Sequence, residues 1–196
     1  VYEEGLIKLA KKILDTFNDN DVFIDVGASI GLFTLMMSKG LCLSFEPHPD
    51  RFEQLIENIS LNKKQDSIVQ NSYFNYAVSN KKQPYRMAIN MEMLVPLHVI
   101  EIVKEEQEKK TFILDEITIL STVHEDMNIK LIKIDTDGHD LQVLQGAEQI
   151  INKHHPTIIV EHWKNEDEIR KFLINKGYEV INFGNNFVTA DRKDMK

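Results

Sequence analysis

The fold is decided by one stretch of the chain, Val22-Phe23-Ile24-Asp25-Val26-Gly27-Ala28-Ser29-Ile30-Gly31. Its first half is a short apolar and β-branched run, which is typical of a buried strand. Small residues follow between the two glycines, and a glycine lets backbone N–H groups approach a ligand without obstruction by a Cβ atom. A helix is expected next, from about Gly31 to Lys39. The stretch therefore predicts the strand, turn and helix that begin an α/β sheet.

Similar strand-like runs alternate with helical periodicity along the rest of the chain. Strands are expected at 22–26, 41–45, 67–78, 131–135 and 157–160, with further extended pieces at 85–89, 111–114, 178–183 and 187–190. Helices are expected at 3–18, from Pro49 onward, over 141–151 and at 167–175. This alternation predicts an open, doubly wound, mostly parallel α/β sheet with an antiparallel C-terminal edge. We expect residues 1–196 to form one domain, with 1–20 as a lead-in helix.

The composition is that of an ordinary soluble globular protein, with 42% hydrophobic and 28% charged residues among 196. The formal net charge is −8, and nucleic acid is a poor partner because binding to phosphates needs a basic surface. The longest apolar stretch, 93–103, is interrupted by Pro96, His98 and Glu101 and is too short to span a bilayer. We therefore expect neither a nucleic-acid partner nor a membrane span.

Cysteine usage and the first residues bear on the compartment. Cys42 lies in an apolar run and has no second cysteine with which to form a disulfide. Residues 1–4 have neither the basic nor the apolar region of a secretory signal. We therefore expect a cytoplasmic protein in which Cys42 is a buried core thiol rather than a nucleophile.

Three acidic residues, Asp25, Glu46 and Asp135, lie at or near the ends of predicted strands. Ligands of doubly wound sheets bind at the carboxyl ends of the strands, so this edge is the expected site. Glu46 follows Gly27 by 19 residues, the distance at which a second-strand acid commonly binds ribose hydroxyls.

The glycine turn discriminates between nucleotide ligands. Ser29 and Leu32 stand where a dinucleotide fingerprint needs its second and third glycines, which disfavours an NAD-type oxidoreductase. Asp25 precedes the first glycine by two residues and can accept hydrogen bonds from an ammonium group, which S-adenosylmethionine (SAM) carries. A structural corner that binds nothing is the alternative interpretation.

Five motifs in order carry a specific resemblance, which runs from about Val22 to Glu161. They are Phe23-Ile24-Asp25-Val26-Gly27-Ala28-Ser29-Ile30-Gly31, Ser44-Phe45-Glu46-Pro47-His48-Pro49, Asn75-Tyr76-Ala77-Val78-Ser79, Leu114-Asp115-Glu116 and Ile132-Lys133-Ile134-Asp135-Thr136-Asp137-Gly138-His139-Asp140. Together they resemble the FkbM family of SAM-dependent methyltransferases. The resemblance implies the class I methyltransferase fold, SAM as cofactor, and O-methylation of hydroxyls on sugars, glycans and natural products.

The resemblance also implies residue roles, taken position by position. Asp25, Gly27, Ala28, Ser29 and Gly31 resemble the turn that holds the methionine part of SAM; Glu46, followed by Pro47, resembles the ribose clamp; Asn75, Ala77 and Val78 match the segment that flanks adenine; and Asp135 resembles the acid near the methionine amino group and the transferred methyl. The chain departs from the family at Ser29, usually Asn, and at Asp137 and Asp140, where the family has glutamates.

An alcohol acceptor must lose its proton during transfer, so a general base is needed. We expect Asp135 or His139 to be that base, with Asp137, Asp140, Glu161 and His162 lining the pocket of a small-molecule or glycan acceptor. The alternative is structural: Asp137 and Asp140 would cap the following helix, and both histidines would be surface or capping residues.

Three further points remain open at the level of sequence. Asp135, Asp137 and His162 could hold magnesium or manganese, but no tight spacing pattern demands a metal, and none is expected. The segment 90–110 is a candidate acceptor lid, or equally a covering helix. A methyltransferase-like module that binds SAM without catalysis is a further alternative.

Overall fold

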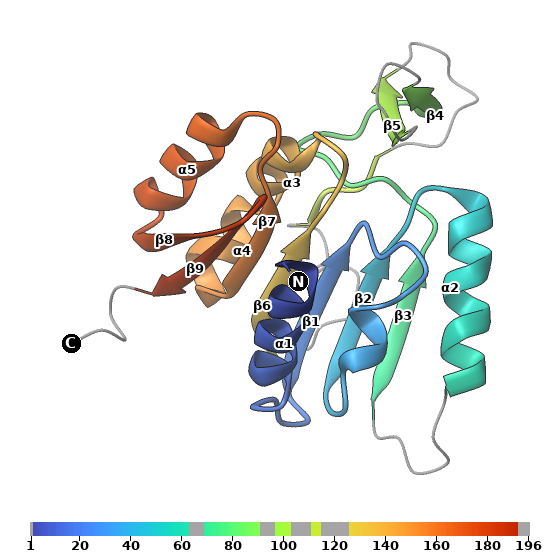
Figure 1. Ribbon diagram of the computed structural model, residues 1–196, viewed down its shortest axis with the longest axis horizontal. Helices are drawn as coiled ribbons and strands as arrows, with labels where there is room; N and C mark the ends of the chain where they lie inside the picture. The colour runs from blue at the N-terminus through green and yellow to red at the C-terminus, as the bar shows by residue number, and fades with distance from the viewer. Residues whose placement is uncertain (1, 63–68, 91–96, 103–110, 115–125, 192–196) are drawn as a thin grey trace.

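The computed structural model describes residues 2–62, 69–90, 97–102, 111–114 and 126–191, and its centre is a seven-stranded sheet (Figure 1). The strand order is β3-β2-β1-β6-β7-β9-β8. The strands are β1 (Asp21–Val26), β2 (Leu41–Phe45), β3 (Gln70–Phe74), β6 (Asn128–Ile134), β7 (Thr157–Glu161), β8 (Tyr178–Phe183) and β9 (Asn186–Asp191). The first five in the order are parallel, whereas β9 pairs antiparallel with both β7 and β8. The predicted doubly wound sheet with an antiparallel edge is confirmed.

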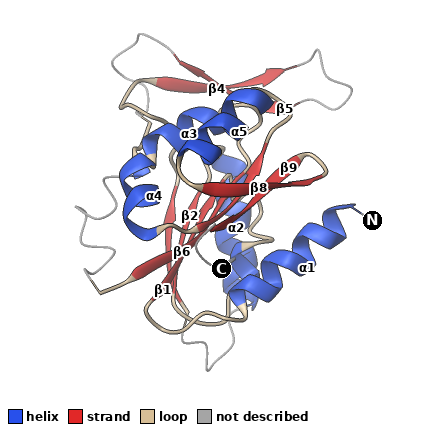
Figure 2. Cartoon of the chain, turned by 90° about the vertical axis from the view of Figure 1, so that its left-hand side faces the viewer, coloured by secondary structure: helices blue, strands red, loops and turns tan. Residues whose placement is uncertain are grey.

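Helices cover both faces of this sheet (Figure 2). They are α1 (Tyr2–Leu14), α2 (Pro49–Asn62), α3 (Asp140–Gly146), α4 (Glu148–His154) and α5 (Glu166–Asn175). Strand residues such as Phe23 and Leu131 pack with the apolar stripe of α1, while their neighbours Ile24 and Ile132 pack with α3, α4 and α5. This alternation of side chains along each strand divides the core into two layers. Among the described helices, none is long and apolar enough to cross a membrane.

The helix expected at 31–39 is wrong, because the described chain forms only a short 3₁₀ segment, η1 (Thr34–Met36). Thr34 is buried, and its hydroxyl donates to Asp25 and lies 2.9 Å from the hydroxyl of Ser44. These contacts pull the segment onto the sheet. The chain then turns at Gly40, whose φ is +86°, and enters β2.

Other predicted boundaries also shift. The helix expected over 141–151 is divided at Ala147 into α3 and α4. The expected strand 67–78 ends at Phe74, and 67–68 lie outside the described residues; Val78 forms only an isolated bridge with Phe112. The lead-in helix is confirmed, but it ends at Leu14 instead of about residue 18.

The candidate lid contains strand rather than helix where the structure describes it. β4 (Tyr85–Asn90) pairs antiparallel with β5 (Leu97–Ile102), and Figure 1 shows this pair beyond the carboxyl ends of β1, β2 and β3. Residues 91–96 and 103–110 of the candidate lid lie outside the described residues, as do Asp115 and Glu116. The pair is therefore placed on the side of the sheet where ligands bind.

Candidate functional site

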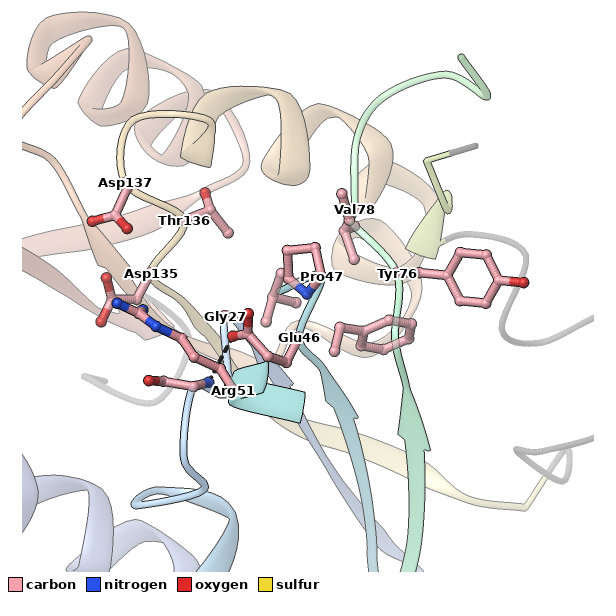
Figure 3. A pocket seen from close by; sticks show the side chains of 13 residues that line it. Gly27, Glu46, Pro47, Arg51, Tyr76, Val78, Asp135, Thr136 and Asp137 are labelled. Carbon is pink, nitrogen blue, oxygen red and sulfur yellow. Dashed lines mark hydrogen bonds between the residues drawn. The ribbon is translucent and has the colours of Figure 1, made fainter. Parts of the chain in front are cut away.

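A pocket opens at the carboxyl ends of the central strands, where β1 lies between β2 and β6 (Figure 3). The connections after β1 and β6 leave toward opposite faces of the sheet there, which is the usual ligand position in this architecture. Its lining comes from four strand ends and α2: Val26, Gly27, Ser29, Phe45, Glu46, Pro47, Arg51, Tyr76, Ala77, Val78, Asp135, Thr136 and Asp137. Eight of the sixteen residues proposed from sequence are in this set: Gly27, Ser29, Glu46, Pro47, Ala77, Val78, Asp135 and Asp137.

The glycine turn after β1 is fixed from two sides. The N–H groups of Gly27 and Ala28 both donate to the carbonyl of Phe45, at 2.9 and 3.0 Å. Gly27 has φ +75°, and a Cβ atom there would lie 1.9 Å from the carbonyl oxygen of Asp135. A side chain cannot be accommodated against that backbone atom, so glycine is required for the walls of the pocket to approach each other. Gly31 lies behind the turn against Leu55, outside the pocket lining.

Glu46 joins the turn to the loop after β2. Its Oε2 accepts from the N–H of Ser29 at 2.8 Å, and its Oε1 accepts from the N–H of His48 at 2.9 Å. The side chain is 4% exposed, and burial raises its pKa above the ordinary value even though these hydrogen bonds oppose the shift. The carboxylate is thus held in one orientation at the base of the pocket.

The opposite wall is apolar. Phe45 stacks on Phe74 with ring centroids 4.7 Å apart, and Phe112 lies 5.4 Å from Phe45. Figure 3 shows Tyr76 and Val78 on this side, away from Asp135 and Asp137. Asn75, by contrast, is not among the lining residues; its Nδ2 donates to the carbonyls of Glu46 and Pro47 at 2.9 and 3.1 Å. Asn75 therefore supports the wall from behind.

Asp25 is placed differently from the direct contact expected for it. The side chain is fully buried, accepts a hydrogen bond from Thr34 at 2.8 Å, and lies 3.4 Å from the ammonium of Lys133. Asp135 is the carboxylate that faces the pocket, with a side chain 47% exposed and 3.6 Å from the same ammonium. Lys133 is buried, which favours its neutral amine, but Asp135 and Asp25 outweigh that effect and raise its pKa.

Three carboxylates meet beside the pocket, from Asp135, Asp137 and Glu161. One oxygen of each lies within 4.8 Å of the others. Burial, followed by the charge of Asp135, raises the pKa of Asp137 to about 6 and that of Glu161 to about 8. Carboxylate oxygens could hold a divalent cation, but the set differs from the predicted one because Glu161 replaces His162. Exposed acidic groups are common without a metal, so this cluster alone does not call for one.

The remaining predicted residues lie outside the pocket lining. The Nε2 of His139 is 3.0 Å from the Ser79 hydroxyl, and burial lowers the pKa of this histidine. Its side chain makes no capping hydrogen bond to α3, so the capping alternative for His139 is wrong. His162 is buried, with its ring stacked on Phe187 at 3.9 Å and its Nδ1 3.7 Å from Glu166. Neither histidine is positioned against the pocket that Asp135 faces.

Asp140 organises the loop after β6. The side chain is buried and accepts hydrogen bonds from the N–H and hydroxyl of Thr136, both at 2.8 Å, and from the N–H of Gly138 at 3.1 Å. It is the first residue of α3, and its oxygens point back to the preceding loop. Burial raises its pKa, although these hydrogen bonds oppose the shift. This placement favours holding Thr136 and Asp137 in position over direct contact with an acceptor.

Sequence reasoning missed the buried Lys133 beside the pocket and five residues of its lining: Val26, Phe45, Arg51, Tyr76 and Thr136. A lysine inside an apolar strand was a usable signal for Lys133, because a buried charge needs a partner. Arg51 carried no signal, since it follows the start of α2 like many exposed residues; in Figure 3 its side chain extends toward Asp135. Its charge lowers the pKa of Asp137 and Glu46, against the effect of burial.

Comparisons with known proteins bear on the family and the fold of this chain. The methyltransferase FkbM domain family matches residues 25–180. The hexuronic acid methyltransferase AglP of Haloferax volcanii is 26% identical over 166 residues, covering 82% of this chain and 62% of the relative. The tRNA(Phe) (4-demethylwyosine(37)-C(7)) aminocarboxypropyltransferase of Methanocaldococcus jannaschii is 34% identical over 67 residues, 32% of this chain and 27% of the relative.

Among solved structures, the methyltransferase FkbM of Methylobacillus flagellatus KT superposes with a TM-score of 0.59 at 15% identity. The superposition covers 89% of this chain and 44% of that chain. The chain thus spans less than two thirds of AglP and less than half of the solved FkbM protein. The structural likeness confirms the predicted class I methyltransferase fold.

Proposed function

Because the chain belongs to the FkbM methyltransferase family, we propose that it transfers the methyl group of SAM to a hydroxyl group of a sugar, glycan or similar small molecule. Family membership favours this reaction over the NAD-type oxidoreductase. The hexuronic acid named for the Haloferax relative supports a sugar as acceptor. The observation that carries the proposal is the placement of Glu46, which is held in the pocket by the N–H groups of Ser29 in the glycine turn and of His48 after β2, while Asp135 lines the same pocket from the end of β6.

The donor groups present fit the parts of SAM. Glu46 keeps lone pairs beyond its two backbone hydrogen bonds and is suited to accept from ribose hydroxyls. Asp135 offers a partly exposed carboxylate for the methionine ammonium, a role that its geometry supports better than the fully buried Asp25. Tyr76, Ala77 and Val78 offer an apolar wall on which a flat base can pack.

SAM, when bound, supplies an electrophilic methyl group on a sulfonium. The chain's own residues then have two tasks, to hold the acceptor oxygen in line and to take its proton. The oxygen forms a bond to the methyl carbon, the carbon–sulfur bond breaks, and the proton passes to a carboxylate. We assign that proton to Asp135 or to Asp137 beside it, because both line the pocket whereas His139 does not. The products are a methyl ether and S-adenosylhomocysteine.

Binding is the first test. Isothermal titration calorimetry with SAM should give saturable binding to the wild type. Glu46→Gln should weaken it by roughly 10- to 100-fold, because an amide loses a charge and cannot accept from both backbone N–H groups and the ribose. Glu57→Gln, on the exposed face of α2, is the matched control and should bind like the wild type. Absence of SAM binding to the wild type would overturn the proposal.

The transferred group is the second test. Sugars, uronic acids and glycolipids are screened with SAM labelled either at the methyl carbon or at the carboxyl carbon. Label transferred only from the methyl carbon supports methyl transfer. Transfer of the carboxyl label would indicate aminocarboxypropyl transfer, the activity named for the Methanocaldococcus relative. Binding without transfer to any acceptor of the panel would favour the noncatalytic module.

A further inference from the structure

We propose that Lys133 is a positioning residue for the methionine end of the cofactor site, where its ammonium ties Asp25 and the Gly27 carbonyl to Asp135. The inference rests on the proposed function, since it concerns the same pocket. Lys133 does not line the pocket, so it acts through residues that do. The role is therefore distinct from the contacts assigned above to Glu46 and Asp135.

The contacts of the Lys133 ammonium define the role. It donates to the carbonyl of Gly27 at 2.7 Å, and it lies 3.4 Å from Asp25 Oδ1 and 3.6 Å from Asp135 Oδ2. The ammonium thus has one hydrogen bond, to the Gly27 carbonyl, and two ion-pair contacts, to Asp25 and Asp135. The side chain is 6% exposed and its ammonium lies 5.2 Å from the centroid of the Phe33 ring. Little solvent reaches the ammonium, so these protein oxygens determine where it lies.

Asp25 anchors the lysine to the sheet. The two residues are directly paired between β1 and β6, and Asp25 is paired on its other side with Ser44 of β2. Thr34 donates to Asp25 Oδ2 and contacts the hydroxyl of Ser44 as well. A buried polar chain thus runs from β2 through Asp25 to Lys133. Hydrogen bonds among Ser44, Thr34 and Asp25 and the ion pair of Asp25 with Lys133 hold this chain in place.

The other two contacts reach opposite walls of the pocket. Gly27 belongs to the turn after β1 and Asp135 follows β6, and both line the pocket. One buried cation between Asp25 and Asp135 compensates one of the two negative charges. The charge that remains is on Asp135, the exposed member, which suits a cationic ligand group. Removing the lysine would leave two like charges and a freed glycine carbonyl at this point.

The experiment uses two ligands that differ at the methionine end. S-adenosylhomocysteine carries the amino acid part, whereas adenosine lacks it. Lys133→Met alone leaves Asp25 buried and unpaired, so the variant to measure is Lys133→Met/Asp25→Asn, which removes both charges. Its loss of affinity for S-adenosylhomocysteine should be roughly 10- to 100-fold, with adenosine affinity within about twofold of the wild type. If this variant does not fold, Lys133→Gln/Asp25→Asn, which keeps a donor for Gly27, replaces it with the same expectation.

Lys130→Met is the matched control, because Lys130 lies on the same strand and pairs with Asp21 at 3.3 Å, away from the pocket. It should leave both affinities unchanged. Adding Asp135→Asn to the Lys133→Met/Asp25→Asn variant should weaken S-adenosylhomocysteine by less than about threefold, although Asp135→Asn alone weakens it more, because the lysine acts through Asp135.

The outcomes are distinguishable. Unchanged affinity for S-adenosylhomocysteine, or an equal loss for both ligands, would overturn the positioning role, since an equal loss indicates general damage to the fold. Independent, additive losses for Lys133 and Asp135 would overturn it as well. A wild type that binds neither ligand would contradict the proposed function itself, and the role of Lys133 with it.

Discussion

The two ends of the β1–β6 strand pair carry nearly the same constellation of residues. At the amino end, Lys130 donates to the Thr16 carbonyl at 3.1 Å, lies 3.3 Å from Asp21 and is 5.2 Å from the Phe17 ring centroid. The carboxyl end repeats this arrangement with Lys133, a carbonyl at 2.7 Å, an aspartate at 3.4 Å and a ring at 5.2 Å. Two features differ: Lys130 is 33% exposed against 6% for Lys133, and Lys133 has a second carboxylate, Asp135, within 3.6 Å.

A register shift makes this repetition geometrically possible. Lys130 and Lys133 are three residues apart, and in an unbroken strand their side chains would point to opposite faces of the sheet. The pairing of β1 with β6 shifts between Val22 and Phe23, which leaves Lys130 beside the irregularity. Both lysines therefore reach the face that packs with α1 and η1. Both ends have an ion pair, so the carboxyl end, where the pocket lies, differs by the burial of its lysine and by the contact of that lysine with a pocket residue.

The largest expected difference is in stability. Lys133→Met should lower the free energy of unfolding by about 3–5 kcal/mol, because the variant leaves the fully buried Asp25 unpaired. Lys130→Met should lower it by only about 1 kcal/mol, since Lys130 is partly exposed and the buried Asp21 keeps a hydrogen bond from the N–H of Asn18. Urea unfolding followed by circular dichroism measures both. Similar losses for the two variants would mean that depth of burial does not separate the two ends.

The next contrast is between two glycines, because a glycine packs against a backbone carbonyl at each end of the β1–β6 strand pair. A Cβ atom on Gly27 would lie 1.9 Å from the Asp135 oxygen, and one on Gly40 would lie 2.3 Å from the Asp21 oxygen. Both φ angles are positive, so each change to alanine should cost about 2–4 kcal/mol of stability. Calorimetry on the folded protein should show SAM binding lost in Gly27→Ala and retained in Gly40→Ala. Retained binding in Gly27→Ala would contradict the role of the turn.

The sequence predicts where a residue lies along a strand better than how deeply its side chain is buried. Residues whose position along a strand places them at the pocket were predicted: Gly27 at its turn, Glu46 after its strand, and Asp135 at the carboxyl edge. Contacts that depend on how deeply a side chain is buried were not predicted. The sequence pattern places Asp25 at a strand end but does not tell that Thr34 folds over it. Because Asp25 is buried against Thr34 and Lys133, the carboxylate that faces the pocket is that of Asp135. Glu161 was expected near the site, but its closeness to Asp135 and Asp137 was not, because it depends on the pairing of β7 with β6.

Several carboxylates lie close together at the carboxyl end of the strand pair, and stability should therefore depend on pH. The pKa of Glu161 is raised to about 8, by burial and then by Asp135, Asp140 and Asp137, while Lys133 opposes the shift. The folded state therefore holds a proton that the unfolded state releases near pH 4.5, so this contribution to stability is present below that pH and is lost as pH rises through 8. Glu161→Gln should raise the free energy of unfolding by about 1 kcal/mol at pH 8.5 and leave it unchanged at pH 4. An equal effect of Glu161→Gln at pH 8.5 and at pH 4 would contradict a raised pKa of Glu161 in the folded protein.

The smallest effect concerns backbone strain. Ser29 at the pocket and His155 before β7 both have positive φ, at 51° and 47°. Glycine tolerates this conformation, so Ser29→Gly and His155→Gly should each raise stability by about 0.5 kcal/mol. The two variants should differ in ligand binding. The N–H of Ser29 donates to Glu46, and a glycine at position 29 makes that turn more flexible before the ligand binds. SAM affinity should therefore fall by about threefold in Ser29→Gly and stay unchanged in His155→Gly. Thermal unfolding and calorimetry on the two variants measure both quantities. A gain of stability in Ser29→Gly without loss of affinity would mean that the strained turn contributes nothing to preorganisation of the site.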